Sequence, residues 1–353
     1  MGEPVILEAV RTPIGKRNGA LRAYRPDALY AKVLDALLER TGIDPGLIGD
    51  VVTGCVTQVG EQGANVVPAV SLNRMCGSSQ QAVHFAAQAI AAGDVDFAIA
   101  GGVESMTRVP MFSDIGGGFH TLNPELGKRY ELVHQGESAE RIAERYGFCR
   151  EELDEWGYLS HKRAARATEE GRFSAQILPL EGLDAEGRPF LLTRDEGVRP
   201  DVDYEKMLAL KPVFRENGVV TAGNSSQISD GAAALLLGDR EKALALGLRP
   251  RARFLARVVV AGDPTLQLLE VIPAAKKALE RAGLSLRDVD VIEVNEAFAS
   301  VVLAFLRELG ADPEKVNPNG GAIAHGHPLG ATGAVHMTKL LYELERTGGE
   351  FGL

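Results

Sequence analysis

Two stretches of this sequence repeat each other at a constant offset of 241 positions. Leu38–Gly42 is echoed by Leu279–Gly283, and Ile48–Val52 meets Val289–Glu293 at the same offset without a gap. Each copy has the pattern of a helix that stops at a glycine, followed by a short turn and a strand. A repeated order of elements indicates a duplicated chain. Because helices and strands alternate, we expect two packed α/β halves with largely parallel sheets.

A stretch of different character separates the two halves, from about 112 to 220. Two of its segments, Ser138–Tyr146 and Glu151–Glu170, are patterned as amphipathic, charge-rich helices, and Glu181–Tyr204 is polar and loop-like. We interpret this stretch as a cap inserted over one face of the α/β body. The predicted domains are a first half at 1–111 that is completed by about 221–245, the cap at 112–220, and a second half at 246–353 that lacks its last strands.

Composition and charge argue against several classes of function. In 353 residues, acidic side chains outnumber basic ones by 48 to 38, which gives a net charge of -10. This balance argues against a nucleic-acid or membrane-surface binder. The three cysteines are too few for a disulfide framework, so we expect a reducing compartment and a cytoplasmic protein. No apolar run is long enough to predict a transmembrane span.

Cys76 is the first candidate for chemistry because it lies between a predicted strand and a predicted buried helix. The apolar run Pro68–Leu72 predicts a buried strand, and Gln80–Ala92, which is apolar nearly all round, predicts a helix inside the protein. The free N–H groups and the positive dipole end of such a helix favour a thiolate. The alternative is an inert core residue, the usual state of a free cysteine.

Two further polar positions follow predicted strands in the second half. Asn295 opens the run Asn295–Ala299, and His327 lies in the glycine-rich Gly326–Pro328. Open α/β sheets bind ligands at such strand ends, and packing the halves together would bring His327 near Cys76. A cysteine and a histidine are the minimal set for an activated sulfur nucleophile, and an uncharged amide suits an oxyanion site. Taken singly, His327 could instead tie down a loop, and Asn295 could cap a helix beginning at Glu296.

The remaining histidines show no metal-site pattern. His84 and His161 lie within predicted helices and are interpreted as structural. His325 lies two residues before His327 and has no predicted role. No histidine pair has ligand spacing to a cysteine or a carboxylate, so no metal is predicted.

With these residues in view, the sequence resembles the thiolase family, the acetyl-CoA acetyltransferases and 3-ketoacyl-CoA thiolases, over nearly its whole length. The motifs that carry the resemblance occur in the family's order: Asn73–Ser78, Gly101–Met106, Thr221–Asn224, Asn295–Ala299 and Asn319–Gly330. The resemblance implies a duplicated, five-layered α/β/α/β/α body with a loop (cap) domain inserted in its first half. The repeat and the insertion fit that architecture.

The resemblance also implies roles for single residues. Cys76 is implied as the nucleophile that becomes acylated, His327 as the group that activates it and helps bind the thioester oxygen, and Asn295 as the holder of a water in that oxyanion site. Coenzyme A or an acyl-CoA is the implied substrate, with no permanently bound cofactor. The implied coenzyme A contacts are Ser226 and His134 at the pantetheine arm and Arg199 near the nucleotide end.

The sequence departs from the family pattern at two places. The family uses a second cysteine, in a Cys-x-Gly segment near its C-terminus, as the acid/base for the enolate. The sequence reaches Leu353 before such a segment, and we expect the polypeptide to continue by a few tens of residues. The family also has another helix where this sequence has only Asn65–Val67 before the strand that leads to Cys76.

The implied activity is thiolysis of a 3-ketoacyl-CoA to acetyl-CoA and a shortened acyl-CoA through an acyl-Cys76 intermediate, or the reverse Claisen condensation. The sequence does not fix the direction. One alternative is a related ketoacyl synthase, which Asn295–Phe298 followed by Gly326–Pro328 disfavours. Another is a thiolase-like scaffold that binds acyl-CoA or lipid without turnover. We expect a homodimer or homotetramer, because the all-round apolar helices need more cover than the polar segments supply.

Overall fold

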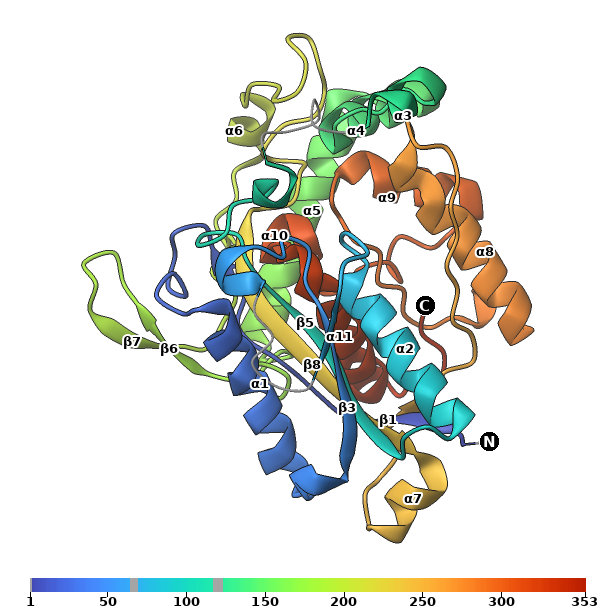
Figure 1. Cartoon of the computed structure of the whole chain (residues 1–353). Helices are drawn as coiled ribbons and strands as arrows, with labels where there is room; N and C mark the ends of the chain where they lie inside the picture. Colours follow the sequence, from blue (N-terminus) through green and yellow to red (C-terminus); the bar gives the residue numbers. More distant parts are fainter. Residues whose placement is uncertain (1, 64–68, 117–122) are drawn as a thin grey trace.

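The centre of the molecule is one mixed β-sheet with helices on both faces (Figure 1). A computed structural model describes residues 2–63, 69–116 and 123–353. The strands follow each other across the sheet in the order β4-β3-β5-β8-β1-β9, and β2 pairs with β8. Their bounds are β1 (Pro4–Arg11), β2 (Gly15–Lys16), β3 (Ile48–Gly54), β4 (Val70–Leu72), β5 (Phe97–Ser105), β8 (Ser229–Asp239) and β9 (Ala252–Arg253).

The direction of the strands differs from the sequence-based expectation. β3 is parallel to both β4 and β5, as predicted. β8, however, is antiparallel to β5 and β1, and β9 is antiparallel to β1. The expectation of a largely parallel sheet is therefore wrong for this side of the sheet. The physical reason is that β8 follows the inserted stretch rather than a crossover helix, so it is free to enter the sheet from the opposite end.

Helices from both halves of the sequence cover the sheet. α1 (Pro26–Thr41) buries one stripe of apolar side chains on one face and ends at Gly42, which has a left-handed conformation. α2 (Ser78–Ala92) and α11 (Thr332–Thr347) cover the other face and pack against each other. Figure 1 shows these two helices, distant in sequence, side by side, with α2 in cyan and α11 in dark red.

A second extended layer lies beyond α2 and α11. Val291 bridges Gly352 and Ile292 bridges Val316, each in parallel register. Ile292 packs in the core of α8 (Val271–Ala282) and α9 (Ala299–Leu309), whereas Glu293 pairs with Lys339 of α11. This alternation places the extended segment between two helical layers. The order is thus helix, sheet, helix, extended segments, helix, which is the expected α/β/α/β/α fold. Its second β layer consists of isolated bridges instead of full strands.

The inserted stretch packs mainly on the second half. The two predicted charged helices are confirmed as α4 (Gln135–Tyr146) and α5 (Arg150–Glu169), and both contact α9. The loop-like expectation for Glu181–Tyr204 is wrong in part, because backbone pairing forms a hairpin there. The remaining elements of the stretch are α3 (Pro124–Arg129), β6 (Leu180–Leu183), β7 (Pro189–Leu192) and α6 (Tyr204–Leu208). The division into domains at 1–111, 112–220 and 246–353 stays a prediction.

Two short helices complete the description, α7 (Arg240–Ala245) and α10 (Ala322–His325). Within the described ranges, no helix has both the length and the apolarity needed to cross a membrane. The departure noted at Asn65–Val67 lies outside the described residues.

Candidate active site

Cys76 lies between β4 and α2, on a loop with an uncommon backbone conformation. Met75 has a φ of 48°, which residues with a Cβ rarely adopt. The Ser78 hydroxyl holds the loop, because it donates to the Met75 carbonyl at 2.6 Å and accepts from the Arg74 N–H at 2.9 Å. The half-buried Cys76 side chain packs against a small apolar cluster that contains Leu329. Strain of this kind is often found where a fold presents a reactive side chain.

The N-termini of α2 and α11 meet beside Cys76. The backbone N–H of Ala334 in α11 donates to the hydroxyl of Ser79 in α2 at 2.9 Å. Leu329, two residues after His327, belongs to the cluster on which Cys76 packs. The structure therefore brings the loop that follows His327 to the side of Cys76.

The resting state of Cys76 differs from the expectation. Burial raises the pKa of the Cys76 thiol to about 12, and the Glu104 carboxylate adds to the effect. The sulfur is therefore a neutral thiol at physiological pH. Cys76 precedes Ser78, the first residue of α2, by two positions, and desolvation outweighs the helix dipole there. A nucleophile in this state needs a base.

His327 is such a base, and its neighbours fix its tautomer. Its Nδ1 atom lies 2.6 Å from the hydroxyl oxygen of Thr332. That hydroxyl donates its single proton to the carbonyl of Pro328 at 3.0 Å, so its oxygen must accept from His327. Nδ1 thus carries the proton, and the lone pair is on Nε2. Burial lowers the pKa of His327 to about 4, which keeps the ring neutral at physiological pH.

Asn295 faces the lone pair of His327. Its Nδ2 atom lies 3.3 Å from Nε2 of the histidine. Its Oδ1 atom is buried and has no hydrogen-bond partner among the described residues. The alternative role as a helix cap is excluded, because α9 begins at Ala299 and has Phe298 at its N-cap position. A buried amide with an unpaired acceptor is a position where a polar ligand or water gains a partner.

Two buried glutamates hold the loops of the site. Glu104 accepts backbone N–H groups from Val56, Thr57 and Gly330 at 2.9, 3.1 and 2.9 Å, which ties the end of β3 to the loop after His327. Glu296 accepts from the Trp156 indole, the Ser160 hydroxyl, the Asn317 amide and the Ile323 N–H. Neither role was derived from the sequence, although a glutamate within the apolar strand Phe97–Ser105 was a usable signal.

Comparisons with known proteins agree with this geometry. The thiolase N-terminal domain matches residues 4–241, and the thiolase C-terminal domain matches residues 248–353. The chain belongs to the thiolase family. The family resemblance, the fold class and the acyltransferase class that the sequence predicted are thereby confirmed.

Individual relatives are similar to this thiolase over its whole length. The chain is 44% identical to the steroid 3-ketoacyl-CoA thiolase FadA6 of Mycobacterium tuberculosis, over 100% of this chain and 90% of that protein. It is 42% identical to the 3-ketoacyl-CoA thiolase of Bacillus subtilis, over 100% and 95%. It is also 42% identical to the 3-oxoadipyl-CoA/3-oxo-5,6-dehydrosuberyl-CoA thiolase of Escherichia coli, over 100% and 96%.

Two of the predicted coenzyme A contacts of this thiolase are linked through aromatic rings. The His134 imidazole stacks on Phe214 with ring centres 5.3 Å apart, and Phe214 contacts Phe298 at 5.8 Å. Ser226 donates its backbone N–H to Ala297, the neighbour of Phe298, at 2.9 Å. A chain of contacts through Phe214 and the buried Phe298 therefore links His134 and Ser226 to the segment that begins at Asn295.

Arg199 lies on another segment. Its side chain is exposed, and its backbone N–H donates to Nδ1 of the buried His161 at 3.2 Å. Its predicted place near the nucleotide stays a prediction. In the part of the chain that the structure describes, no group of three or more His, Cys, Asp or Glu side chains is arranged to hold a metal ion.

Proposed function

We propose that this thiolase cleaves 3-ketoacyl-CoA with coenzyme A through an acyl-Cys76 intermediate. One observation carries the proposal: His327 is neutral, bears its lone pair on Nε2 and lies on the loop that packs beside a protonated Cys76. This pairing supplies both the base and the nucleophile that the reaction needs. The coenzyme A ester is the substrate, with no permanently bound cofactor.

The proposed reaction begins when Nε2 of His327 takes the proton from Sγ of Cys76. The thiolate attacks the 3-keto carbon, and the carbonyl electrons move to its oxygen. The tetrahedral intermediate collapses, the bond between C2 and C3 breaks, and the enolate takes up the proton that Nε2 of His327 received and leaves as acetyl-CoA. Nε2 then takes the proton of the coenzyme A thiol, and the coenzyme A sulfur attacks the acyl-Cys76 thioester. The Cys76 thiolate leaves and regains its proton from His327, and the shortened acyl group departs as acyl-CoA. The reverse sequence is the Claisen condensation.

His327 and Asn295 are proposed to stabilise the developing oxyanion. After accepting the proton from Cys76, Nε2 becomes a donor. Asn295 lies 3.3 Å from that nitrogen, and its own Oδ1 has no partner among the described residues. An amide with this unused acceptor is suited to orient a water whose hydrogen points at the oxyanion. Fixed donors at such a site lower the barrier more than solvent does.

The coenzyme A arm is proposed to lie along the surface formed by His134 and Ser226, with Arg199 near the nucleotide phosphates. The ring stack of His134, Phe214 and Phe298 gives an apolar wall suited to pantetheine. Relatives named for steroid, oxoadipyl and unspecified 3-ketoacyl substrates share 42–44% identity with this chain. The proposal is therefore for the 3-ketoacyl-CoA class.

Trapping the intermediate tests this function directly. Purified protein is incubated with labelled acetyl-CoA in the absence of an acceptor, and the labelled peptide is mapped by mass spectrometry. The expected label is on Cys76, and release of labelled acyl-CoA should follow addition of coenzyme A. A matched control is Cys149→Ser, because Cys149 is exposed at the N-cap of α5 and serine keeps a cap there. Binding of acyl-CoA without label or turnover would instead indicate a scaffold.

We also propose a homodimer or homotetramer in the cytoplasm. β4 is an edge strand of the sheet, and an uncovered edge is a template for pairing with a second chain. Val70 in that strand and Phe85 on the adjacent α2 are both exposed. The three free cysteines support a reducing compartment.

A further inference from the structure

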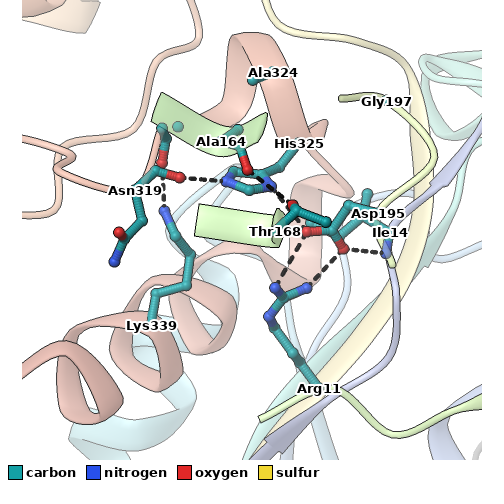
Figure 2. A network of polar contacts seen from close by, with 12 residues as sticks. Arg11, Ile14, Ala164, Thr168, Asp195, Gly197, Asn319, Ala324, His325 and Lys339 are labelled. Carbon is teal, nitrogen blue, oxygen red and sulfur yellow. Dashed lines mark hydrogen bonds and ion pairs between the residues drawn. The ribbon is translucent and has the colours of Figure 1, made fainter. Parts of the chain in front are cut away.

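A buried network of charged side chains ends at His325, two residues before His327 (Figure 2). The side chains of Arg11, Asp195 and His325 are 0%, 1% and 3% exposed. They come from the end of β1, from the stretch between β7 and α6, and from α10. Three segments that are distant in sequence thus meet behind the turn that carries the proposed base.

Asp195 is the centre of this network. Its Oδ1 atom accepts from Arg11 at 2.8 Å and from the backbone N–H of Ile14 at 2.8 Å. Its Oδ2 atom accepts from Arg11 at 3.2 Å and lies 2.8 Å from Nδ1 of His325. Burial acts to raise the pKa of Asp195, but the Arg11 guanidinium and His325 hold it well below its usual range. Asp195 is therefore a carboxylate at physiological pH.

His325 has an acceptor at each ring nitrogen. Nδ1 faces the Asp195 carboxylate, and Nε2 lies 2.8 Å from the backbone carbonyl of Asn319. Both ring nitrogens of His325 thus have a polar partner within hydrogen-bond distance, and the ring links Asp195 to Asn319. Lys339 extends the link, because it donates to the next carbonyl, that of Gly320, at 2.7 Å.

The backbone of the turn after His325 is tightly constrained. Gly326 has a φ of 110°, and a Cβ there would lie 2.2 Å from the Ser229 hydroxyl and 2.9 Å from the Ile14 side chain. Ile14 is the residue whose N–H binds Asp195. The backbone N–H of His327 donates to that same Ser229 hydroxyl at 3.1 Å. The Asp195 carboxylate thus contacts the turn from two sides. It contacts His325, which precedes the turn, and the N–H of Ile14, whose side chain packs against Gly326.

The segment that carries Asp195 also packs directly on α10. A Cβ at Gly197 would lie 2.7 Å from the Ala324 carbonyl. The Gln227 amide donates to the carbonyls of Gly197, Ile323 and Ala324 at 3.1, 2.9 and 3.0 Å. The inserted stretch is therefore held by packing and by the Gln227 hydrogen bonds against α10, the short helix that precedes the proposed base.

We propose that Asp195 is a positioning residue for the thiolase reaction, acting through His325 and Ile14 to fix the direction of His327. The inference rests on the proposed function, because it assigns a role toward the base of that reaction. Removing one partner of a buried ion pair leaves an uncompensated charge and destabilises the fold, and a displacement of the base by about 1 Å can slow a reaction by about a hundredfold. The activities of the variants are therefore compared in folded protein only.

Asp195→Asn tests the proposal, because the amide keeps the size of the side chain but replaces one carboxylate oxygen by an NH2 group, which then faces an Arg11 N–H and either the Ile14 N–H or His325. We expect kcat per active site, counted by acyl label on Cys76, to fall by about 10- to 100-fold. We expect KM for coenzyme A to change by less than about threefold, since the proposed coenzyme A contacts lie elsewhere. The rate of Cys76 alkylation by iodoacetamide should fall together with kcat.

A pair of His325 variants gives a second test that does not depend on the folding of Asp195→Asn. In His325→Asn the side-chain amide can take the place of Nδ1 and keep the contact to Asp195, whereas His325→Leu removes it. We expect His325→Asn to retain several-fold more kcat than His325→Leu. Arg251→Gln is the matched control, because it removes ion pairs to Glu8 and Glu345 away from the turn. It should lower Tm while leaving kcat unchanged.

Three results would overturn the inference. One is wild-type kcat in folded Asp195→Asn or in His325→Leu. Another is equal kcat in His325→Asn and His325→Leu, and the third is a rise in KM with kcat unchanged. A wild-type protein that shows no thiolysis would instead refute the proposed function itself, so the two failures are distinguishable.

Discussion

The Nδ1 atom of His327 lies 2.6 Å from the hydroxyl oxygen of Thr332, one helical turn further along the chain. Because that hydroxyl gives its proton to the Pro328 carbonyl, the contact keeps the histidine proton on Nδ1. Nε2 then carries the lone pair that can take the proton of Cys76, and the Asn295 amide lies 3.3 Å from it. A single threonine at the start of α11 thereby decides whether His327 can act as a base.

Replacing Thr332 tests the contribution of its hydroxyl, which makes both hydrogen bonds. In Thr332→Val the oxygen is lost, His327 has no fixed tautomer, and we expect kcat to fall roughly tenfold, the worth of one hydrogen bond of ~1.4 kcal/mol. Thr332→Ser should keep most of the activity. Thr338→Val is a matched control on the same helix, because Thr338 is also buried and its hydroxyl donates to the carbonyl of Ala334. A Thr332→Val enzyme no slower than Thr338→Val would contradict the assignment of the tautomer.

Cys76→Ala should abolish acyl transfer and leave the fold intact. The sulfur is the proposed nucleophile, and alanine fits beside the small apolar cluster with a loss of only about 1 kcal/mol of stability. Steady-state thiolysis and circular dichroism of the same preparation check both halves of the expectation. Wild-type turnover in a pure sample would remove Cys76 from the mechanism.

His327→Asn should slow acylation of the enzyme by about 100- to 10,000-fold while changing the affinity for coenzyme A little. The reason is that Nε2 acts on the sulfur and the oxyanion, whereas the proposed coenzyme A contacts lie on other loops. Single-turnover labelling measures the first quantity, and calorimetric titration with coenzyme A measures the second. Equal losses in both would make His327 a structural loop residue.

The parts of the fold that the sequence predicted are those with local periodicity. α2, α4, α5 and α11 follow from apolar spacing, and the repeat at Leu38 and Leu279 predicted the duplicated order of elements. The antiparallel entry of β8 was missed, because strand direction depends on which distant strand is already paired. The neutral thiol of Cys76 was missed for a related reason, since burial depends on side chains such as Leu329 that arrive from the other half.

The sequence predicted the reacting groups of the site better than the residues that position them. His327 and Asn295 were identified because they are polar residues in glycine-rich or apolar surroundings, and they do form a contact. The Asp195 network was not predicted, because its members come from three separate segments with no common local pattern. Arg11 gave the available signal, as a charged residue that follows the apolar Ala9 and Val10 at the end of β1.

Acid should destabilise the protein before the carboxylates titrate. Burial lowers the pKa of His84, His161 and His327 to about 4 each, whereas an unfolded histidine titrates near 6.5. Between these values the unfolded chain binds more protons, so the free energy of unfolding should decrease as pH falls from about 6.5 to 4. Each histidine contributes at most ~1.4 kcal/mol per pH unit.

Urea unfolding at a series of pH values measures this slope. His84→Gln removes one of the three groups from a helix position that the proposed reaction does not use, and it should make the slope shallower. Besides burial, the positive charges of Arg257 and Arg74 lower the pKa of His84. An unchanged slope would mean that His84 takes up its proton in the folded protein as readily as in the unfolded chain.

The edge of the sheet should be an interface between two copies of the chain. Val70 is 52% exposed in edge strand β4, Met75 is 54% exposed on the Cys76 loop, and Phe85 is 45% exposed on α2. The outer edge of β4 has no strand partner among the described residues. A second copy of the same strand could pair with that edge and cover the apolar side chains beside it. We expect sedimentation velocity at micromolar concentration to show a dimer or tetramer.

Phe85→Lys should shift the distribution towards the monomer, because it places a charge in the covered surface. Leu244→Lys, which alters an equally exposed leucine on α7 away from this edge, should leave the distribution unchanged. A monomeric wild-type protein, or equal effects of the two variants, would show that this edge is not the interface.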